Sequence, residues 1–546
     1  MTDTTRAPSS AAISSLAPLK VKLFRALWIA SLISSIGGWM QTVGAQWYLV
    51  ENHSDPAIVA LIQTASAAPF LLLGIPAGVL GEFVNRRRLL IAVQSCLVAI
   101  GVVLSAVTWL GGMTPALLLA FTFLLGAGSA VQGPAYQALV PEIVPRAVIP
   151  SAAALSSIGV NVARSIGPAL AGLAISALGI PFVFALNALS FAVFLLVLVT
   201  WRGYSPPAHR PEPFVEATRA GLRYVWNAGL VRRVLVRLAL FIVPASALWA
   251  LLPLLAASRL GLDSNGYGLL LAALGVGSVG GAFVIPRARA RLGANTTVMI
   301  ASAAFGATIV VSALSTSLPL TLAVLVVGGV GWIAVIASLN GSVQAFLPGW
   351  VRSRGLSLYQ LVLFGSTAAG SAVIGGVAQA VGVVPTSVGA GVVVIGVAAS
   401  QLLWPLMSTE HKDRGVVAIP LTDAPPVDDV APLSISDAAE TLVLIRYRVS
   451  IENRPAFVAQ MQLVRRSRRR TGARRWELYD DREERDVIVE AFSVGSWREH
   501  LSQHEERMTG FDQGELDAAR ALATGDPEVR HLTQLDPAAA AAAASA

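Results

Sequence analysis

Long apolar blocks, separated by short polar connections, make up most of the first 407 residues. Each block approaches the roughly 20 residues that an α-helix needs to cross a bilayer core with its backbone hydrogen bonds satisfied internally. The blocks lie at 24–48, 56–80, 89–110, 115–138, 152–178, 181–201, 234–257, 266–286, 295–314, 318–344, 355–380 and 383–407. This pattern predicts an all-α membrane region of twelve spanning helices.

Positive charge alternates between the connections. Those after odd-numbered blocks hold almost none: Glu51, His53 and Asp55 lie at 50–55, and 258–264 contains only Arg259. Those after even-numbered blocks contain Arg86–Arg88, Arg146, Arg202 through Arg233, Arg287–Arg291, Arg352 and Arg354. Because positively charged connections stay on the cytoplasmic side of a membrane, we expect both termini in the cytoplasm. A soluble protein built from a dozen buried helices is the alternative, and it would not need this alternation.

Composition supports a lipid environment. The chain is 55% hydrophobic and 13% charged, whereas soluble domains carry about 25% charged residues. The net charge of +8 would suit nucleic acid, but its arginines lie in short runs between apolar blocks, so we expect a bilayer and no nucleic acid as partner. The single cysteine, Cys96, lies inside an apolar block and excludes a disulfide framework or a cysteine metal site.

The two halves of the membrane region resemble each other. The sequence QALVP at 137–141 ends the fourth block, and QAFLP at 344–348 ends the tenth. Gly179 and Gly382 close the fifth and eleventh blocks in similar surroundings. Such an internal repeat predicts two parallel six-helix halves, with a substrate site between them near the middle of the membrane.

These features divide the chain into seven parts. We expect a disordered N-terminus at 1–20, a first six-helix half at 21–201, a cytoplasmic linker at 202–233, a second half at 234–407, a linker at 408–439, a soluble domain at 440–536 and a low-complexity tail at 537–546.

Three local motifs identify a family. The connection after the second block reads GVLGEFVNRRR from Gly78 to Arg88, the fourth block contains GAGSA and GPA at 126–135, and the fifth contains NVARSIGPALAG at 161–172. Residues 20–408 thus resemble a major facilitator superfamily transporter of the branch that includes the enterobactin exporter. Glu82 replaces the Asp usual in that branch, and Asn85 stands where many members have Gly.

The resemblance implies the twelve-helix major facilitator fold and a role in the inner cell membrane. It further implies secondary-active export of a small amphipathic molecule, siderophore-like or drug-like, by alternating access. An importer, or a membrane-anchored protein whose C-terminal domain is an oxidative enzyme, are the alternatives.

Arg164 is the charged residue that lies deepest inside a predicted span. Burying it against lipid is costly, by about 2.5–3.5 kcal/mol, so it should face a cavity or a partner. Ser157, Asn161, Arg164 and Pro168 follow one helical stripe. A contact with the substrate and a structural pin to neighbouring carbonyls both remain open.

Amides and aromatic residues within the spans are further candidates for the substrate path. They are Gln41, Gln46, Gln63, Gln132, Tyr136, Asn161, Asn340, Gln344, Tyr359 and Gln360. As a set they favour a cavity with mixed polar and aromatic walls, but each one could equally make a hydrogen bond between helices.

The connection after the second block is a candidate gate. Glu82 beside Arg86, Arg87 and Arg88 could form an ion pair in one transport state only, and Gly78 begins the motif. In the fifth block, Gly167, Pro168 and Gly172 should bend the helix or allow close packing.

Two kinds of functional motif are absent from the sequence. It has no phosphate-binding glycine-lysine loop, and none of its spans contains a carboxylate in mid-membrane. We therefore expect a transporter that hydrolyses no ATP, binds no cofactor and is not an enzyme.

In the C-terminal segment the expected strands and helices alternate, as in a soluble α+β domain. Strands are expected at 441–451, 474–479, 487–494 and 531–535, with helices at 455–470, 497–508 and 515–523. This order predicts a ferredoxin-like domain. It resembles the small domains of antibiotic-biosynthesis monooxygenases, which pair through their sheets, and this implies a homodimer.

Two charged features of that domain have competing explanations. His500 and His504 are one helical turn apart, but no third ligand is evident and Glu499, Glu505 and Glu506 suggest a solvated face, so we expect no metal. The arginines at 465–475 either contact anionic lipid or are solvated.

Overall fold

The computed structural model describes residues 16–201, 222–406, 413, 415–418 and 439–534, without the side chains of 75, 77–83 and 353. Its contacts divide the chain into two compact units. The helical unit comprises 1–211, 237–339 and 359–405, and the C-terminal unit comprises 212–236, 340–358 and 406–546. Each unit is described by itself below.

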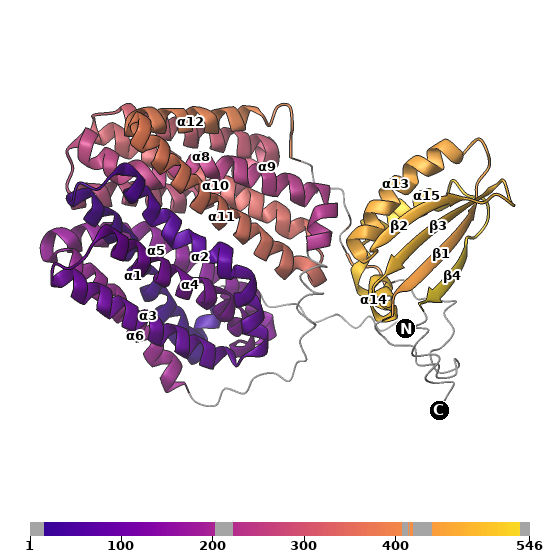
Figure 1. Cartoon of the computed structure of the whole chain (residues 1–546), viewed down its shortest axis with the longest axis horizontal. Helices are drawn as coiled ribbons and strands as arrows, with labels where there is room; N and C mark the ends of the chain where they lie inside the picture. The colour runs from indigo at the N-terminus through magenta and orange to yellow at the C-terminus, as the bar shows by residue number, and fades with distance from the viewer. Residues whose placement is uncertain (1–15, 202–221, 407–412, 414, 419–438, 535–546) are drawn as a thin grey trace, which may run out of the picture. The chain divides into compact units, whose positions relative to one another are not determined.

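Helices account for nearly all of the described residues before residue 400 (Figure 1). They are α1 Lys22–Glu51, α2 Pro56–Phe83, α3 Arg86–Trp109, α4 Pro115–Ile143, α5 Ile149–Leu178, α6 Ile180–Thr200, α8 Gly229–Leu260, α9 Ser264–Leu314, α10 Leu318–Phe346, α11 Gly349–Val381 and α12 Val383–Ala399. Among the described residues, ten helices are long and apolar enough to cross a membrane, and α12 is a shorter apolar helix.

The 51-residue helix α9 contains a break. Gly293 has φ 76° and ψ 165°, which are not helical values. Glycine reaches this region without the steric penalty that other residues meet. The apolar blocks expected at 266–286 and 295–314 lie on the two sides of this glycine.

Equivalent turns end α5 and α11. Gly179 (φ 85°) follows α5, Gly382 (φ 96°) follows α11, and each amide donates to a carbonyl four residues earlier. The two repeated glycines noted in the sequence therefore make the same turn, one after α5 and one after α11.

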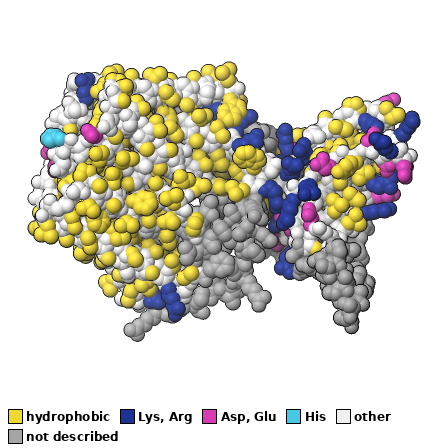
Figure 2. All heavy atoms as spheres, in the orientation of Figure 1, with side chains coloured by type: hydrophobic (Ala, Val, Ile, Leu, Met, Phe, Trp, Pro, Cys, Tyr) yellow, Lys and Arg dark blue, Asp and Glu magenta, His cyan; other side chains and the backbone are white. Residues whose placement is uncertain are grey.

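Apolar side chains are spread over the whole visible surface of the helical unit, with few charged side chains among them, as Figure 2 shows. Val102, Leu189 and Phe283 are 54%, 59% and 69% exposed. A surface of this kind is stable against lipid and would be unfavourable in water.

A four-stranded antiparallel sheet forms the centre of the domain at the C-terminal end. The elements are β1 Thr441–Arg448, α13 Arg454–Thr471, β2 Arg475–Asp480, β3 Val487–Val494, α14 Trp497–Ser502, the π-helical turn η4 Gln503–Arg507, α15 Gly510–Arg520 and β4 Glu528–Thr533. The strand order is β2-β3-β1-β4. All four predicted strands are present, although β4 begins three residues earlier, and the helix expected at 497–508 changes to a π-turn after Ser502.

One face of this sheet packs under α13 and α15. Val443, Ile445 and Tyr447 alternate along β1 towards Phe457 and Met461 of α13. Alternation on the strand and helical spacing on α13 thus place the apolar side chains in one core.

The arginine cluster at 465–475 is only partly solvated. Arg468 and Arg470 are 5% and 7% exposed, because Arg468 Nε donates to Glu490 at 3.1 Å and Arg470 pairs with Asp512. The expectation of a wholly lipid-facing or solvated cluster was wrong at these two positions, since the pairing carboxylates come from other elements.

Candidate site at the junction of the helical halves

For description, α1–α6 are called the first half and α8–α12 the second half. Small residues allow α5 to cross α9 closely. A Cβ atom added to Gly268 would lie 2.8 Å from the Pro168 carbonyl oxygen and 3.1 Å from the Gly172 Cα. Ser165 Oγ donates to the Gly275 carbonyl at 3.0 Å. Pro168 and Gly172, expected to bend or pack the helix, therefore lie in a contact between the halves. Gly167 instead packs on Trp39 of α1.

Gln46 of α1 joins the same two halves by hydrogen bonds. Its Nε2 donates to the Trp249 carbonyl of α8 at 2.9 Å, and its Oε1 accepts from the Tyr267 hydroxyl of α9 at 2.8 Å. The Trp47 and Tyr267 rings stack at 5.7 Å. Since both ends of the amide have partners, Gln46 acts in this structure as a tie between the halves.

The contacts between the halves lie towards one end of the bundle. We call this the arginine-poor end, where α1, α5, α8 and α11 finish and α2 and α9 begin. Ser176 bonds Asn265 at 3.1 Å near that end, Thr64 bonds the Ala368 carbonyl at 2.9 Å, and Phe70 stacks on Phe364 at 4.1 Å near the helix midpoints. The halves are therefore packed together from this end to about the middle.

Arg164 lies on an aromatic cluster at this junction. Its guanidinium carbon is 5.6 Å from the Trp39 ring of α1, which is 5.9 Å from the Trp249 ring of α8. Trp249 in turn lies 5.7 Å from Trp332 of α10, and Trp332 lies 5.4 Å from Phe305 of α9. The cluster thus runs from the first half into the second.

This cluster contains hydrogen-bond donors without acceptors. Arg164 Nε and Trp249 Nε1 are buried, and neither has a hydrogen-bond partner among the described residues. No described carboxylate forms an ion pair with Arg164. The junction therefore offers a positive charge, an indole N–H and aromatic faces. Trp249 and Trp332 were not predicted, because tryptophan in an apolar block carries no local sign of which neighbour it meets.

Three other predicted path residues are packed within a half. Gly37 and Gly44, one turn on either side of Gln41, lie against Asn187 and Phe184 of α6, so Gln41 shares a face that packs on α6. Tyr136 meets Phe194 edge-on at 5.8 Å in a buried cluster. The Tyr359 hydroxyl donates to the Ile336 carbonyl at 3.2 Å.

The remaining candidates show few contacts to other helices. Asn161 Nδ2 donates to the Ser157 carbonyl of its own helix at 2.9 Å, and Gln344 donates to Asn340, also within one helix. Gln63 of α2 and Gln132 of α4 are half-buried, and Gln360 of α11 is exposed.

The arginines after α2 pair within the first half. Arg86 forms an ion pair with Glu142 of α4, and Arg87 donates to the Leu198 and Val199 carbonyls of α6 at 2.9 and 3.1 Å. The Arg88 amide donates to Asn85, which caps α3. The backbone of Gly78 and Glu82 belongs to α2, and the Glu82 side chain lies outside the described residues.

A second arginine within a membrane helix was missed. Arg237 of α8 is 2% exposed, lies 5.5 Å from the Trp404 ring and donates to the Trp404 carbonyl. Its position near the start of a span resembles ordinary topology charge, which is why the sequence did not single it out.

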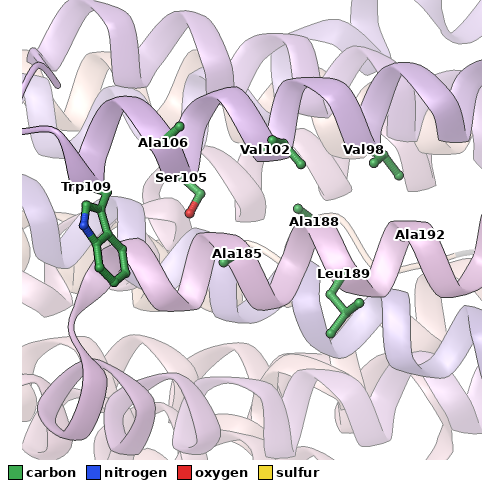
Figure 3. Close-up of a pocket in the computed structure, with 9 residues that line it drawn as sticks. All are labelled: Val98, Val102, Ser105, Ala106, Trp109, Ala185, Ala188, Leu189 and Ala192. Carbon is green, nitrogen blue, oxygen red and sulfur yellow. The ribbon is translucent and has the colours of Figure 1, made fainter.

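An apolar groove of about 460 Å³ lies elsewhere, between α3 and α6 (Figure 3). Val98, Val102, Trp109 and Leu189 line it, and Ser105 of the lining donates to the Pro181 carbonyl at 2.9 Å. None of the predicted path residues lines this groove.

Within the C-terminal unit, Glu499 of α14 holds together segments that are distant in sequence. Its carboxylate accepts from Arg223 at 2.8 Å, from Arg507 at 3.1 Å and from the Gly495 amide at 3.0 Å. Burial alone would raise the pKa of Glu499, but the charges of Arg223 and Arg507 outweigh it and lower that pKa. Arg507 lies 4.9 Å from the Trp350 ring at the start of α11.

His531 of β4 joins the two histidines noted in the sequence. The ring centroids of His504 and His531 lie 4.8 and 4.9 Å from that of His500. Burial lowers the pKa of His500 to about 3 and that of His504 to about 4, so both rings are neutral. Among the described residues no group of three side chains has a geometry that could hold a metal ion.

Comparison with known sequences places this arrangement in context. A family model described as transmembrane secretion effector matches residues 13–539. The Staphyloferrin A transporter of Staphylococcus aureus is 25% identical over 169 residues, which cover 31% of this chain and 43% of that protein. The multidrug efflux pump Tap of Mycobacterium tuberculosis is 27% identical over 216 residues, covering 37% and 51%. The chain spans about half the length of these curated relatives.

Solved structures share the helical architecture. A bacterial homologue of the human lysosomal transporter Spinster, in an inward-facing and unoccupied conformation, gives a TM-score of 0.56 at 17% identity, covering 71% of this chain and 97% of that one. The nucleoside transporter NupG gives 0.53 at 14% identity, covering 70% and 98%. At these identities the likeness concerns the fold alone.

Proposed function

Because the chain belongs to the transmembrane secretion effector family of multi-pass membrane transporters, we propose that it exports a small amphipathic molecule from the cytoplasm to the exterior. The family and the named relatives are transporters, so an enzymatic role for the chain is set aside. Export by secondary-active alternating access is the form of transport that we propose.

We propose twelve spans in two halves. Counting α9 as two spans that meet at Gly293, and adding the short helix α12, gives six spans after residue 229 to match α1–α6. With both termini in the cytoplasm, the arginine-poor end faces the exterior. The packing of the halves at that end then corresponds to a state closed to the exterior.

The observation that carries the proposal is the cluster of Arg164, Trp39 and Trp249. It combines a charge, an N–H donor and aromatic faces, and its members come from both halves. A molecule that contacts both halves would be bound differently when they rock apart, and alternating access needs this difference.

The direction and the substrate have one decisive test. The media of cells with and without the protein are compared for exported metabolites, and a candidate is offered to membrane vesicles of both orientations. Accumulation in inside-out vesicles that Arg164→Ala abolishes, with membrane insertion retained, supports the proposal. Accumulation only in right-side-out vesicles would establish import instead.

For the C-terminal domain we propose a ferredoxin-like fold that pairs with a second copy, as in monooxygenase-like domains. The face of the sheet away from α13 carries Leu442, Tyr479 and Leu532, which are 36%, 56% and 47% exposed. Pairing of two such faces would bury them. Cross-linking of the full chain, with Leu532→Asp as the variant, should detect a dimer that the added charge disrupts.

A further inference from the structure

The aromatic cluster at the junction has an excess of donors. Arg164 Nε and Trp249 Nε1 are both buried, and in the described part of the helical unit neither finds an acceptor. Leaving a buried donor unpaired is energetically unfavourable. Two such groups in one cluster are explained if a bound molecule brings the acceptors.

The charge at the junction has one sign. Arg164 is a permanent cation, and it has no ion pair with a carboxylate among the described side chains. A cationic molecule would be repelled in a site of low dielectric constant, whereas an anion would gain a charge-assisted hydrogen bond. The site is therefore suited to an anion.

The rings around these donors provide flat apolar surfaces. Trp39, Trp249 and Trp332 are each half-buried. The ring centroids of Trp39 and Trp249 are 5.9 Å apart, and those of Trp249 and Trp332 are 5.7 Å apart. The Arg164 guanidinium carbon lies 5.6 Å from the Trp39 centroid. A planar group can stack on such faces while an attached anion reaches the guanidinium.

We propose that the transported molecule is an aromatic or otherwise planar anion, such as an aryl carboxylate or phenolate. Its anionic group binds Arg164, a second acceptor takes the Trp249 N–H, and its planar part lies on Trp39 and Trp332. This rests on the proposed function, because it assigns the substrate class of the same junction. Contact with Arg164 and Trp39 in one half and Trp249 and Trp332 in the other makes binding depend on how the halves are arranged.

The test uses four probes with the purified full-length protein. They are 2-naphthoate, its neutral analogue 2-naphthamide, the cation 2-naphthylmethylammonium and citrate, an anion without a ring. Binding is followed by quenching of tryptophan fluorescence. We expect saturable binding of naphthoate, with the other three weaker by about tenfold or more, which corresponds to about 1.4 kcal/mol.

Variants assign that preference to the two donors. Arg164→Gln should weaken the binding of naphthoate by about tenfold and leave the binding of naphthamide nearly unchanged, which removes the preference for the anion. Arg164→Lys should keep part of that preference. Trp249→Phe keeps an aromatic ring but removes the N–H donor, so it should weaken the binding of naphthoate. The matched controls are Arg146→Gln and Trp109→Phe, which change exposed side chains outside the junction.

The outcome separates this inference from the proposed function. Equal affinity for the cation and the anion overturns the assigned substrate class. An anion preference that survives Arg164→Gln overturns the assignment of that preference to Arg164. If the exported metabolite proves to be a cation, the substrate class fails while export stands. If vesicles of neither orientation accumulate any metabolite, export fails, and the probe measurements still decide whether the junction selects anions.

Discussion

Gly268 of α9 lies so close to Gly172 of α5 that a Cβ on Gly268 would be 3.1 Å from the Gly172 Cα. The neighbouring Pro168 carbonyl oxygen would be nearer still, at 2.8 Å. Because the obstacles are backbone atoms, a larger residue at 268 cannot be accommodated by moving a side chain.

Gly268→Val should therefore separate the two halves at the arginine-poor end and reduce transport. A reporter cysteine at Ser176, in a Cys96→Ser background, should react faster with a membrane-impermeant maleimide. Gly280→Val, on the same helix, is the matched control, because a Cβ at Gly280 would meet nothing within 4 Å. Equal labelling rates for the two glycine variants would contradict the close packing.

Loss of the ion pair between Arg86 and Glu142 should destabilise the first half. The two side chains are 23% and 15% exposed, so the loss is expected to be about 1 kcal/mol, near the upper range for partly exposed pairs. Glu142→Gln should lower the thermal unfolding midpoint in detergent, while Arg88→Gln, at an exposed position, should not. The exchanged pair Arg86→Glu with Glu142→Arg should recover part of the loss. An unchanged midpoint for Glu142→Gln would show that the pair contributes nothing to stability.

Glu499→Gln should loosen the contact between α14 and residues 222–228. The amide keeps the size of the side chain but cannot balance Arg223 and Arg507. Hydrogen exchange of the full-length protein should then increase at 222–228 and at the first turns of α11. Glu505→Gln, on the exposed side of the next turn, is the control. If exchange rises equally in both variants, the specific contact with Glu499 is not responsible.

Acid should destabilise the C-terminal domain through its histidines. The pKa values of about 3 for His500 and about 4 for His504 lie below 6.5, the ordinary value, so the unfolded chain binds protons that the folded domain does not. Stability is complete above pH 6.5 and falls below it, with a slope that approaches about 1.4 kcal/mol per pH unit for each histidine.

The measurement is urea unfolding of the full-length protein at pH 7 and below, with brief proteolysis at a common pH to score the folded domain. Replacing both residues, as His500→Phe and His504→Phe, should flatten the dependence between about pH 6.5 and 5. His53→Asn, outside this domain, should leave it unchanged. A slope that persists in the double variant would assign the effect to other groups.

Sequence patterns predicted the helices and strands well, because secondary structure depends mainly on residues that are close in sequence. The apolar block at 152–178 corresponds to α5, which ends at the glycine that the sequence marked, and alternation located β1 and β3 to within a few residues. Helix length, strand alternation and turn residues all depend on neighbours in sequence.

Pairings between distant segments were not predictable from these patterns. The sequence predicts Gln46 as a path residue, and its amide accepts a hydrogen bond from Tyr267, which is 221 residues away. Trp249 and Trp332 gain their role only when α8 and α10 come together, and Arg468 is buried only because Glu490 lies on a neighbouring strand. Each depends on the fold rather than on the residues beside it.

The contact of Glu499 with Arg223 has a consequence for regulation. Arg223 lies just before α8, the first helix of the second half, and Glu499 lies in the C-terminal domain. A molecule that binds Glu499 in place of Arg223 breaks this ion pair, so it must favour arrangements of α8 in which Arg223 and Glu499 are apart. Thermodynamic reciprocity then requires a substrate that favours the same arrangements to tighten binding of that molecule by the same factor. The ion pair in this way couples ligand binding at α14 to the position of residues 222–228.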